Sequence, residues 1–196
     1  MLAPGRRTKQ LKKTKMRKTG LFIILLMICS GLYSQIYIAS SSEISFFSEA
    51  TIENIEAVNK ASKPILNTST GDIQIKIPMK GFVFAKPLMQ EHFNEDYAES
   101  EKFPDAFFRG KINEQIDYTK DGEYKATAAG KITIHGVEKE KTLEGTLIVK
   151  GGHIVLQTKF NIHIADYGIK VPSLYVKNIA EDVSVKLNAT LDPYKK

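Results

Sequence analysis

Apolar and polar residues alternate along most of the chain after residue 34, a period that is typical of β-strands with one buried face. The segment 183–191 alternates without an exception, and in 153–168 the even-numbered positions from Ile154 to Ile164 share one face. The same pattern occurs in 35–49, 71–85, 108–118, 123–136 and 141–152. Glycine-containing turn signals separate them at 70–72, 120–122, 135–136 and 151–152. The pattern predicts roughly eight strands.

Segment 71–85 contains a change of register. Its apolar residues begin on odd positions, but after Gly81 the phenylalanines Phe82 and Phe84 continue on the former polar face. A glycine followed by a switch of face indicates a bulge or a bend in a barrel strand. Pro78 lacks a backbone donor, so we expect the strand to be irregular there.

Segment 88–110, LMQEHFNEDYAESEKFPDAFFRG, breaks the two-residue period. If its first part is helical, Met89, Phe93 and Tyr97 lie on one face at i, i+4 and i+8. His92 neighbours this face, and Asp96 is its expected partner. We predict a short helical cap over one end of the barrel, with His92 donating to a ligand's polar head. An ordinary amphipathic connection that closes the core is the alternative.

The fold class predicted is all-β, an eight-stranded antiparallel barrel with a short helical cap segment. Half-polar strands with tight turns argue against a parallel α/β sheet, and no internal repeat is visible. A barrel of eight strands is either packed solid or holds one ligand. The side chains predicted to line the interior and its cover are Phe46, Ile73, Ile75, Ile77, Phe82, Phe84, Met89, His92, Phe93, Tyr97, Phe107, Phe160 and Ile162.

The N-terminal 34 residues have the pattern of an export signal. Residues 1–18 carry eight basic side chains and no acid, and 21–29 are continuously apolar but too short to span a bilayer. We expect a signal peptide over 1–34, with Met16 as an alternative start, and one domain over 35–196. An uncleaved membrane anchor and lipid attachment at Cys29 are the alternatives. The expected location is periplasmic or otherwise extracytoplasmic.

Charge and cysteine content exclude two kinds of site. Without residues 1–34, the chain has 20 basic and 22 acidic residues, so its mixed surface gives no electrostatic reason to bind nucleic acid. Cys29 is the only cysteine, so 35–196 can form neither a disulfide nor a cysteine metal site.

The remaining polar residues do not form a catalytic or metal motif. No H-x-H or H-x-x-x-H spacing occurs, so we expect no metal site. His135 is expected to bond its own turn, whereas His153 and His163 are expected at the surface. The acids between Glu91 and Glu101 are expected to form a solvated face. No nucleophile elbow or phosphate loop is present, so we expect no enzyme.

Four segments together resemble the YceI-like family: ITIHGVEKEKTL (132–143), EKFPDAFFRGKI (101–112), DYGI (166–169) and DVSVKL (182–187). That family consists of small secreted lipocalin-like barrels associated with polyisoprenoid and other long-chain lipid binding. Many relatives carry an arginine before the Phe-Pro step and another before the DYGI segment, and this chain has neither. The resemblance implies an uncharged lipid or a quinone in place of an anionic lipid.

Residues and resemblance together predict an exported lipid-binding protein. It would hold a polyisoprenoid, quinone-like or fatty molecule in the barrel for carriage or buffering, without covalent chemistry or a covalent cofactor. Transient contact with a membrane surface and homodimer formation are compatible with this role. The alternative is a barrel with a packed lumen that acts as an envelope interaction or stress-response module.

Overall fold

The computed structural model describes residues 35–49, 54–170 and 181–195. The predicted export signal, with Met16 and Cys29, lies outside these ranges. Within them, no helix combines the length and the apolar character that crossing a bilayer requires.

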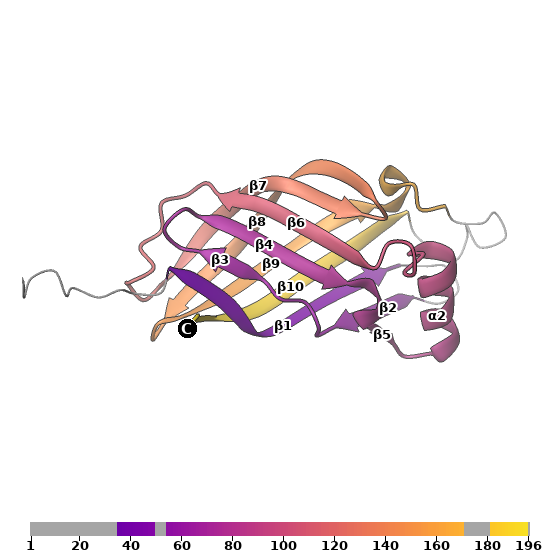
Figure 1. Ribbon diagram of the computed structural model, residues 1–196, viewed down its shortest axis with the longest axis horizontal. Coiled ribbons are helices and arrows are strands. Elements are labelled where there is room, and N and C mark those ends of the chain that lie inside the picture. The colour runs from indigo at the N-terminus through magenta and orange to yellow at the C-terminus, as the bar shows by residue number, and fades with distance from the viewer. Residues whose placement is uncertain (1–34, 50–53, 171–180, 196) are drawn as a thin grey trace, which may run out of the picture. The chain divides into compact units, whose positions relative to one another are not determined.

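The described chain forms a closed antiparallel barrel with a short helical segment at one end (Figure 1). Its strands are β1 Ile36–Ser48, β2 Ile55–Asn59, β3 Ile65–Asn67, β4 Asp72–Pro78, β5 Phe82–Phe84, β6 Asp105–Ile112, β7 Gly122–Ile134, β8 Val137–Lys150, β9 His153–His163 and β10 Asp182–Pro193. From β6 to β10 each strand pairs with the next, and β10 pairs with β1 along most of its length. This pairing closes the sheet and removes its edges.

Two of the eight barrel strands are interrupted. β2 and β3 both pair with β1, so 55–67 is one strand with a break in the middle. β4 and β5 likewise pair with β3 and β2. The predicted barrel of eight antiparallel strands is therefore confirmed, although the pattern of alternation did not identify 55–67.

The break between β4 and β5 occurs where the sequence predicted it. β4 ends at Pro78, and the single 3₁₀ turn η2, Met79–Gly81, leads into β5. The Asn59 amide donates to the Pro78 carbonyl at 2.7 Å. A side chain at Gly81 would come within 2.8 Å of that amide nitrogen, so the close approach requires glycine. After the turn Phe82 and Phe84 are buried, which confirms the change of face.

The helical segment follows β5. Helix α2, Pro87–His92, starts with a proline in its first turn and continues into the π-helical turn η3, Phe93–Tyr97. The expected strand over 108–118 begins and ends earlier, because β6 covers Asp105–Ile112 and a loop follows it. In Figure 1, α2 lies at the end of the barrel opposite the C-terminus.

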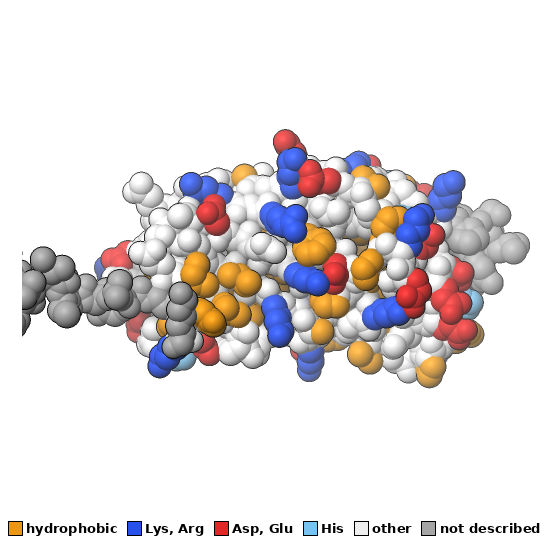
Figure 2. Space-filling view, viewed as in Figure 1, with side chains coloured by type: hydrophobic (Ala, Val, Ile, Leu, Met, Phe, Trp, Pro, Cys, Tyr) orange, Lys and Arg blue, Asp and Glu red, His pale blue; other side chains and the backbone are white. Residues whose placement is uncertain are grey.

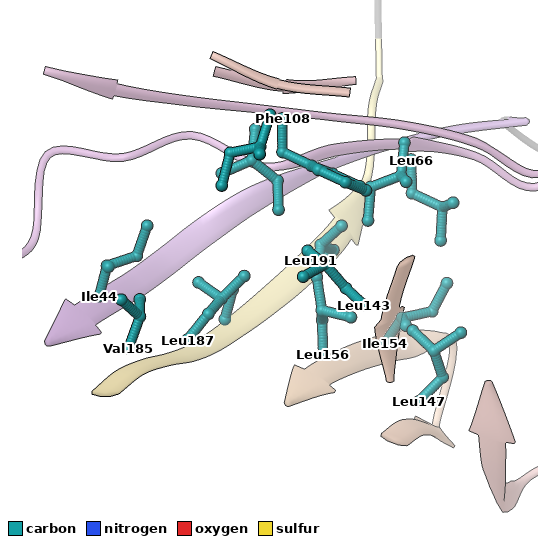
Figure 3. Packing of buried hydrophobic residues seen from close by; sticks show 14 of the residues in the cluster. Ile44, Leu66, Phe108, Leu143, Leu147, Ile154, Leu156, Val185, Leu187 and Leu191 are labelled. Atoms are coloured by element: carbon teal, nitrogen blue, oxygen red, sulfur yellow. The ribbon is translucent and has the colours of Figure 1, made fainter. Parts of the chain in front are cut away.

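The interior is packed most tightly at the end away from α2. There the side chains of Leu66, Leu147, Val149, Ile154 and Leu191 are at most 2% exposed. Figure 3 shows them meeting residues from other strands inside the barrel. Half-buried apolar residues instead predominate toward the helical end, among them Phe46, Phe93, Phe160 and Ile162.

Candidate functional site

A cavity of about 400 Å³ occupies the helical end of the barrel. Most of its lining is aliphatic or aromatic, and the volume lies within the range of roughly 300–1,000 Å³ that is typical of small-molecule pockets. The lumen is therefore hollow at one end and packed at the other. The predicted residues in its lining are Phe46, Ile75, Ile77, Phe82, Phe84, Met89, His92, Phe93, Tyr97, Phe107, Phe160 and Ile162.

Two predicted interior residues differ from the rest. Ile73 is buried but is not in this lining, because it lies farther along β4 toward the packed end. Phe107 contributes to the lining, but its ring lies 4.8 Å from the guanidinium carbon of the exposed Arg109. Successive side chains of a strand point to opposite faces, so the inward residues of β6 are Ala106 and Phe108.

Four phenylalanine rings join the helical segment to the barrel wall. The Phe93 ring centroid lies 5.6 Å from that of Phe46, 5.6 Å from that of Phe82 and 5.0 Å from that of Phe84. Phe46 also contacts the Phe82 and Phe84 rings edge to face. Such ring pairs contribute beyond the area they bury. The cluster therefore anchors the cover at Phe93, as the i, i+4, i+8 spacing indicated.

The sequence analysis did not select several aliphatic wall residues. Ile132, Ile134, Val185 and Leu187 line the cavity from β7 and β10. Their positions on the inward face follow from the alternation of these two strands, so the signal was available. We had favoured aromatic residues, and that preference left them out.

His92 lies at the rim of the cavity on the helical segment. Its Nδ1 is 2.8 Å from Asp96 Oδ2, which confirms the expected i, i+4 pair. Both side chains are about half exposed and both belong to the lining. The pair can therefore meet a ligand's polar end or the surrounding water.

His135 connects three elements instead of bonding its own turn, so that expectation was wrong. Its Nε2 lies 2.6 Å from Glu99 Oε2 and its Nδ1 lies 3.2 Å from the Tyr167 carbonyl oxygen. Because a carbonyl oxygen only accepts, Nδ1 carries a proton, and a further proton lies between Nε2 and the Glu99 carboxylate. The side chain is 13% exposed and also lines the cavity.

The backbone explains how these partners meet. His135 and Gly136 both have positive φ, 51° and 74°, as the two central residues of a tight hairpin turn require. Glu99 also has a positive φ of 43°, just after the helical segment ends. Glu99 is thus a missed site residue, and it does not belong to a purely solvated acidic face. The link ties the cover to the β7–β8 turn and to η4, Ile164–Tyr167.

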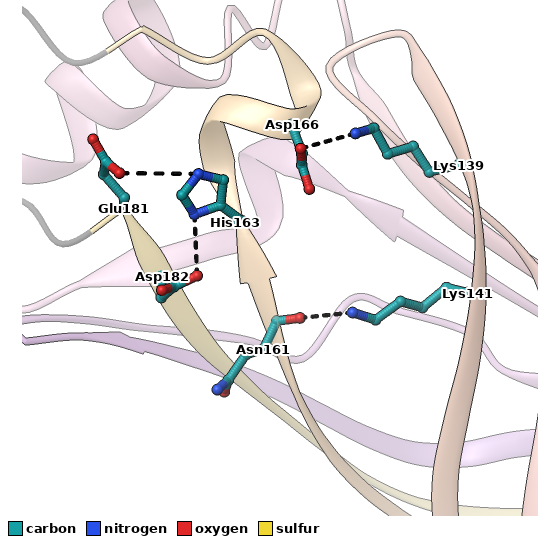
Figure 4. A network of polar contacts seen from close by, with 7 residues as sticks. All are labelled: Lys139, Lys141, Asn161, His163, Asp166, Glu181 and Asp182. Atoms are coloured by element: carbon teal, nitrogen blue, oxygen red, sulfur yellow. Dashed lines mark hydrogen bonds and ion pairs between the residues drawn. The ribbon is translucent and has the colours of Figure 1, made fainter.

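A second polar network supports the same rim (Figure 4). Lys139 pairs with Asp166 at 2.9 Å, and this hydrogen bond lowers the pKa of Asp166 below its ordinary value. His163 Nδ1 lies 3.2 Å from Asp182 Oδ1, at the junction of β9 and β10. His153, at the opposite end of β9, is exposed and pairs with Asp192 at 2.5 Å. Within the described ranges, these histidines and acids form no cluster of three that could hold a metal ion.

The fold and the sequence both match known proteins. The domain reaches a TM-score of 0.70 with the structure of a polyisoprenoid binding domain from Saccharophagus degradans implicated in plant cell wall breakdown, at 14% identity over 82% of this chain and 99% of that one. It reaches 0.64 with BcnA of Burkholderia cenocepacia, at 17% identity over 76% of this chain and 95% of that one. No curated protein matches the chain. The family model described as YceI-like domain matches residues 37–191, and the chain therefore belongs to the YceI-like family.

Proposed function

We propose that this protein is an exported carrier or buffer of one long apolar molecule of the polyisoprenoid, quinone-like or fatty type. The observation that carries the proposal is the cavity of about 400 Å³ beneath the helical cover, with its apolar wall. Each methylene group moved from water into such a cavity contributes about 0.8 kcal/mol, so a long chain gains affinity without specific polar contacts. The printed description of the Saccharophagus degradans domain as polyisoprenoid binding supports the same ligand class.

Export and membrane exchange form part of the proposal. The basic and apolar pattern of residues 1–34 supports release from the cytoplasm. Val83 on β5 and Leu88 on α2 are more than 60% exposed close to the cover. Exposed apolar side chains at the entrance favour brief contact with a membrane surface during loading. Homodimer formation stays a prediction.

Native mass spectrometry tests the proposal on protein purified without detergent. We expect an organic-extractable molecule to leave the protein on denaturation. Ile75→Trp should abolish its retention, because Ile75 is 4% exposed and lines the cavity. Val83→Trp adds a similar bulk at an exposed site and should retain it.

Thermal unfolding of both variants establishes that the barrel still forms, since overpacking costs about 1–3 kcal/mol. Empty protein that also fails to take up added isoprenoids would contradict the proposal. In that case the interaction module would become the better hypothesis, and its partner should depend on the exposed side chains of residues 88–101.

A further inference from the structure

The cavity lining contains no lysine or arginine among the described residues. Its side chains with acid–base chemistry are His92, Asp96, His135 and the phenol of Tyr97. His135 uses both ring nitrogens on protein acceptors, and the Thr158 hydroxyl donates to the Glu144 carbonyl. The lining thus offers no cation to an anionic ligand, and these donors are already engaged.

The lysines around this end of the barrel are also engaged. Lys80 pairs with Glu101, Lys102 approaches Glu99 at 3.9 Å, and Lys139 pairs with Asp166 at 2.9 Å. Lys141 donates to the Asn161 carbonyl, as Figure 4 shows. Lys170 follows Ile169 but is exposed and is not part of the lining.

Carboxylates predominate on the outer side of the cover. Glu91, Glu95 and Asp96 are exposed on α2 and η3, and Glu101 follows them. Figure 2 shows acidic side chains gathered at the end of the visible face where α2 lies. Among these residues only Asp96 also lines the cavity. A neutral His92 would leave the charge of Asp96 in place at the entrance.

We propose that the cavity selects ligands whose polar end is uncharged, and that Asp96 is the residue that rejects anionic ends. The inference rests on the proposed function and narrows its ligand class to alcohols, quinones and other neutral heads. Phosphorylated isoprenoids and ionised fatty acids would have to bring a negative charge next to Asp96 without a compensating cation. Like charges at such short range disfavour the complex.

Farnesol and farnesyl monophosphate form a matched pair of probes, because they share one chain and differ in the head. Competition with a fluorescent apolar dye gives both affinities on the full exported chain, at about pH 8, above the range in which histidine ordinarily carries charge. An ionic strength of about 0.15 M limits electrostatic effects to roughly 8 Å. We expect farnesol to bind at least tenfold more tightly than the phosphate.

Two variants with the same change of charge separate Asp96 from the general acidity of the cover. Asp96→Asn should reduce the preference for farnesol at least threefold, whereas Glu95→Gln, one residue earlier and outside the lining, should leave it nearly unchanged. Both side chains are exposed, so both variants should fold. An equal effect of the two variants would overturn the assigned role of Asp96.

The affinities of the unmodified chain distinguish the two levels of the proposal. Equal or tighter binding of farnesyl monophosphate would overturn the selection for neutral heads and leave the lipid-binding function standing. Failure of both probes to bind would overturn the proposed function and this inference with it.

Discussion

Replacing Phe93 by alanine should release the helical cover from the barrel while leaving the barrel folded. The Phe93 ring contacts three other phenylalanine rings, those of Phe46, Phe82 and Phe84. No other side chain of the helical segment takes part in this ring cluster. The variant removes these contacts in one step and keeps the helix-forming character of the segment.

The expected loss follows from those contacts. Each aromatic pair contributes about 0.5–1.5 kcal/mol beyond its buried area. Truncation of a fully buried phenylalanine costs about 3–5 kcal/mol. Because Phe93 is only partly buried, we expect about 2–3 kcal/mol for the attachment of the cover. At about 1.4 kcal/mol per factor of ten, the open state becomes about 30- to 150-fold more populated.

Native-state hydrogen exchange measures this opening directly. Amide protection in Pro87–Tyr97 should fall by that factor, while protection in β8 and β9 changes little, because local opening does not require global unfolding. Leu88→Ala is the matched control, since Leu88 is 61% exposed on the same helix. An equal loss of protection throughout the barrel would refute the reasoning, as would unchanged protection of the cover.

Three further predictions concern stability. Glu99→Ala should cost about 1 kcal/mol in denaturant unfolding, because it removes a partly exposed partner of the His135 link, whereas Glu91→Ala should cost almost nothing. Gly130→Ala should cost more than about 2 kcal/mol, since a Cβ there would lie 2.3 Å from a carbonyl oxygen of β6; Gly122→Ala, which meets only a tyrosine ring at 3.2 Å, should cost less, and equal losses in thermal unfolding would contradict this. Burial raises the pKa of Tyr118 from 10 to about 12, so its contribution to stability is intact below pH 10 and is lost as the pH rises through 12. Tyr118→Phe should remove that alkaline loss, and an unchanged pH profile of the unfolding free energy would refute the assignment.

Alternation predicted most of the barrel because most inward positions are large and apolar. It failed at 55–67, where the buried positions include Ala57, Asn59, Ser62 and Pro64. Small and polar residues at inward positions give no hydrophobic period, although the strand pairs with β1 and with the interrupted strand β4–β5. The interruption at Pro78–Gly81 was predictable, because both residues have backbone constraints that the sequence displays.

The candidate site was predictable in its wall and cover but not in its long-range contacts. The spacing within 89–97 identified the covering face and the His92–Asp96 pair. The turn at His135 was also visible, but its partners lie 36 residues before it and 32 residues after it. Nor does residue type separate the hollow end from the packed end, since Ile154 and Ile162 share one face of β9 and only Ile162 lines the cavity.

Methyl NMR with added farnesol tests the central claim, that the helical end of the barrel holds the apolar ligand. The account predicts that the methyl groups of Ile132, Ile134 and Val185, which line the cavity, shift and show contacts to the farnesol chain. Methyl groups of Leu147 and Leu191 at the packed end should be unaffected. Farnesol contacts confined to outward-facing methyl groups, or no shifts at saturation, would contradict the account.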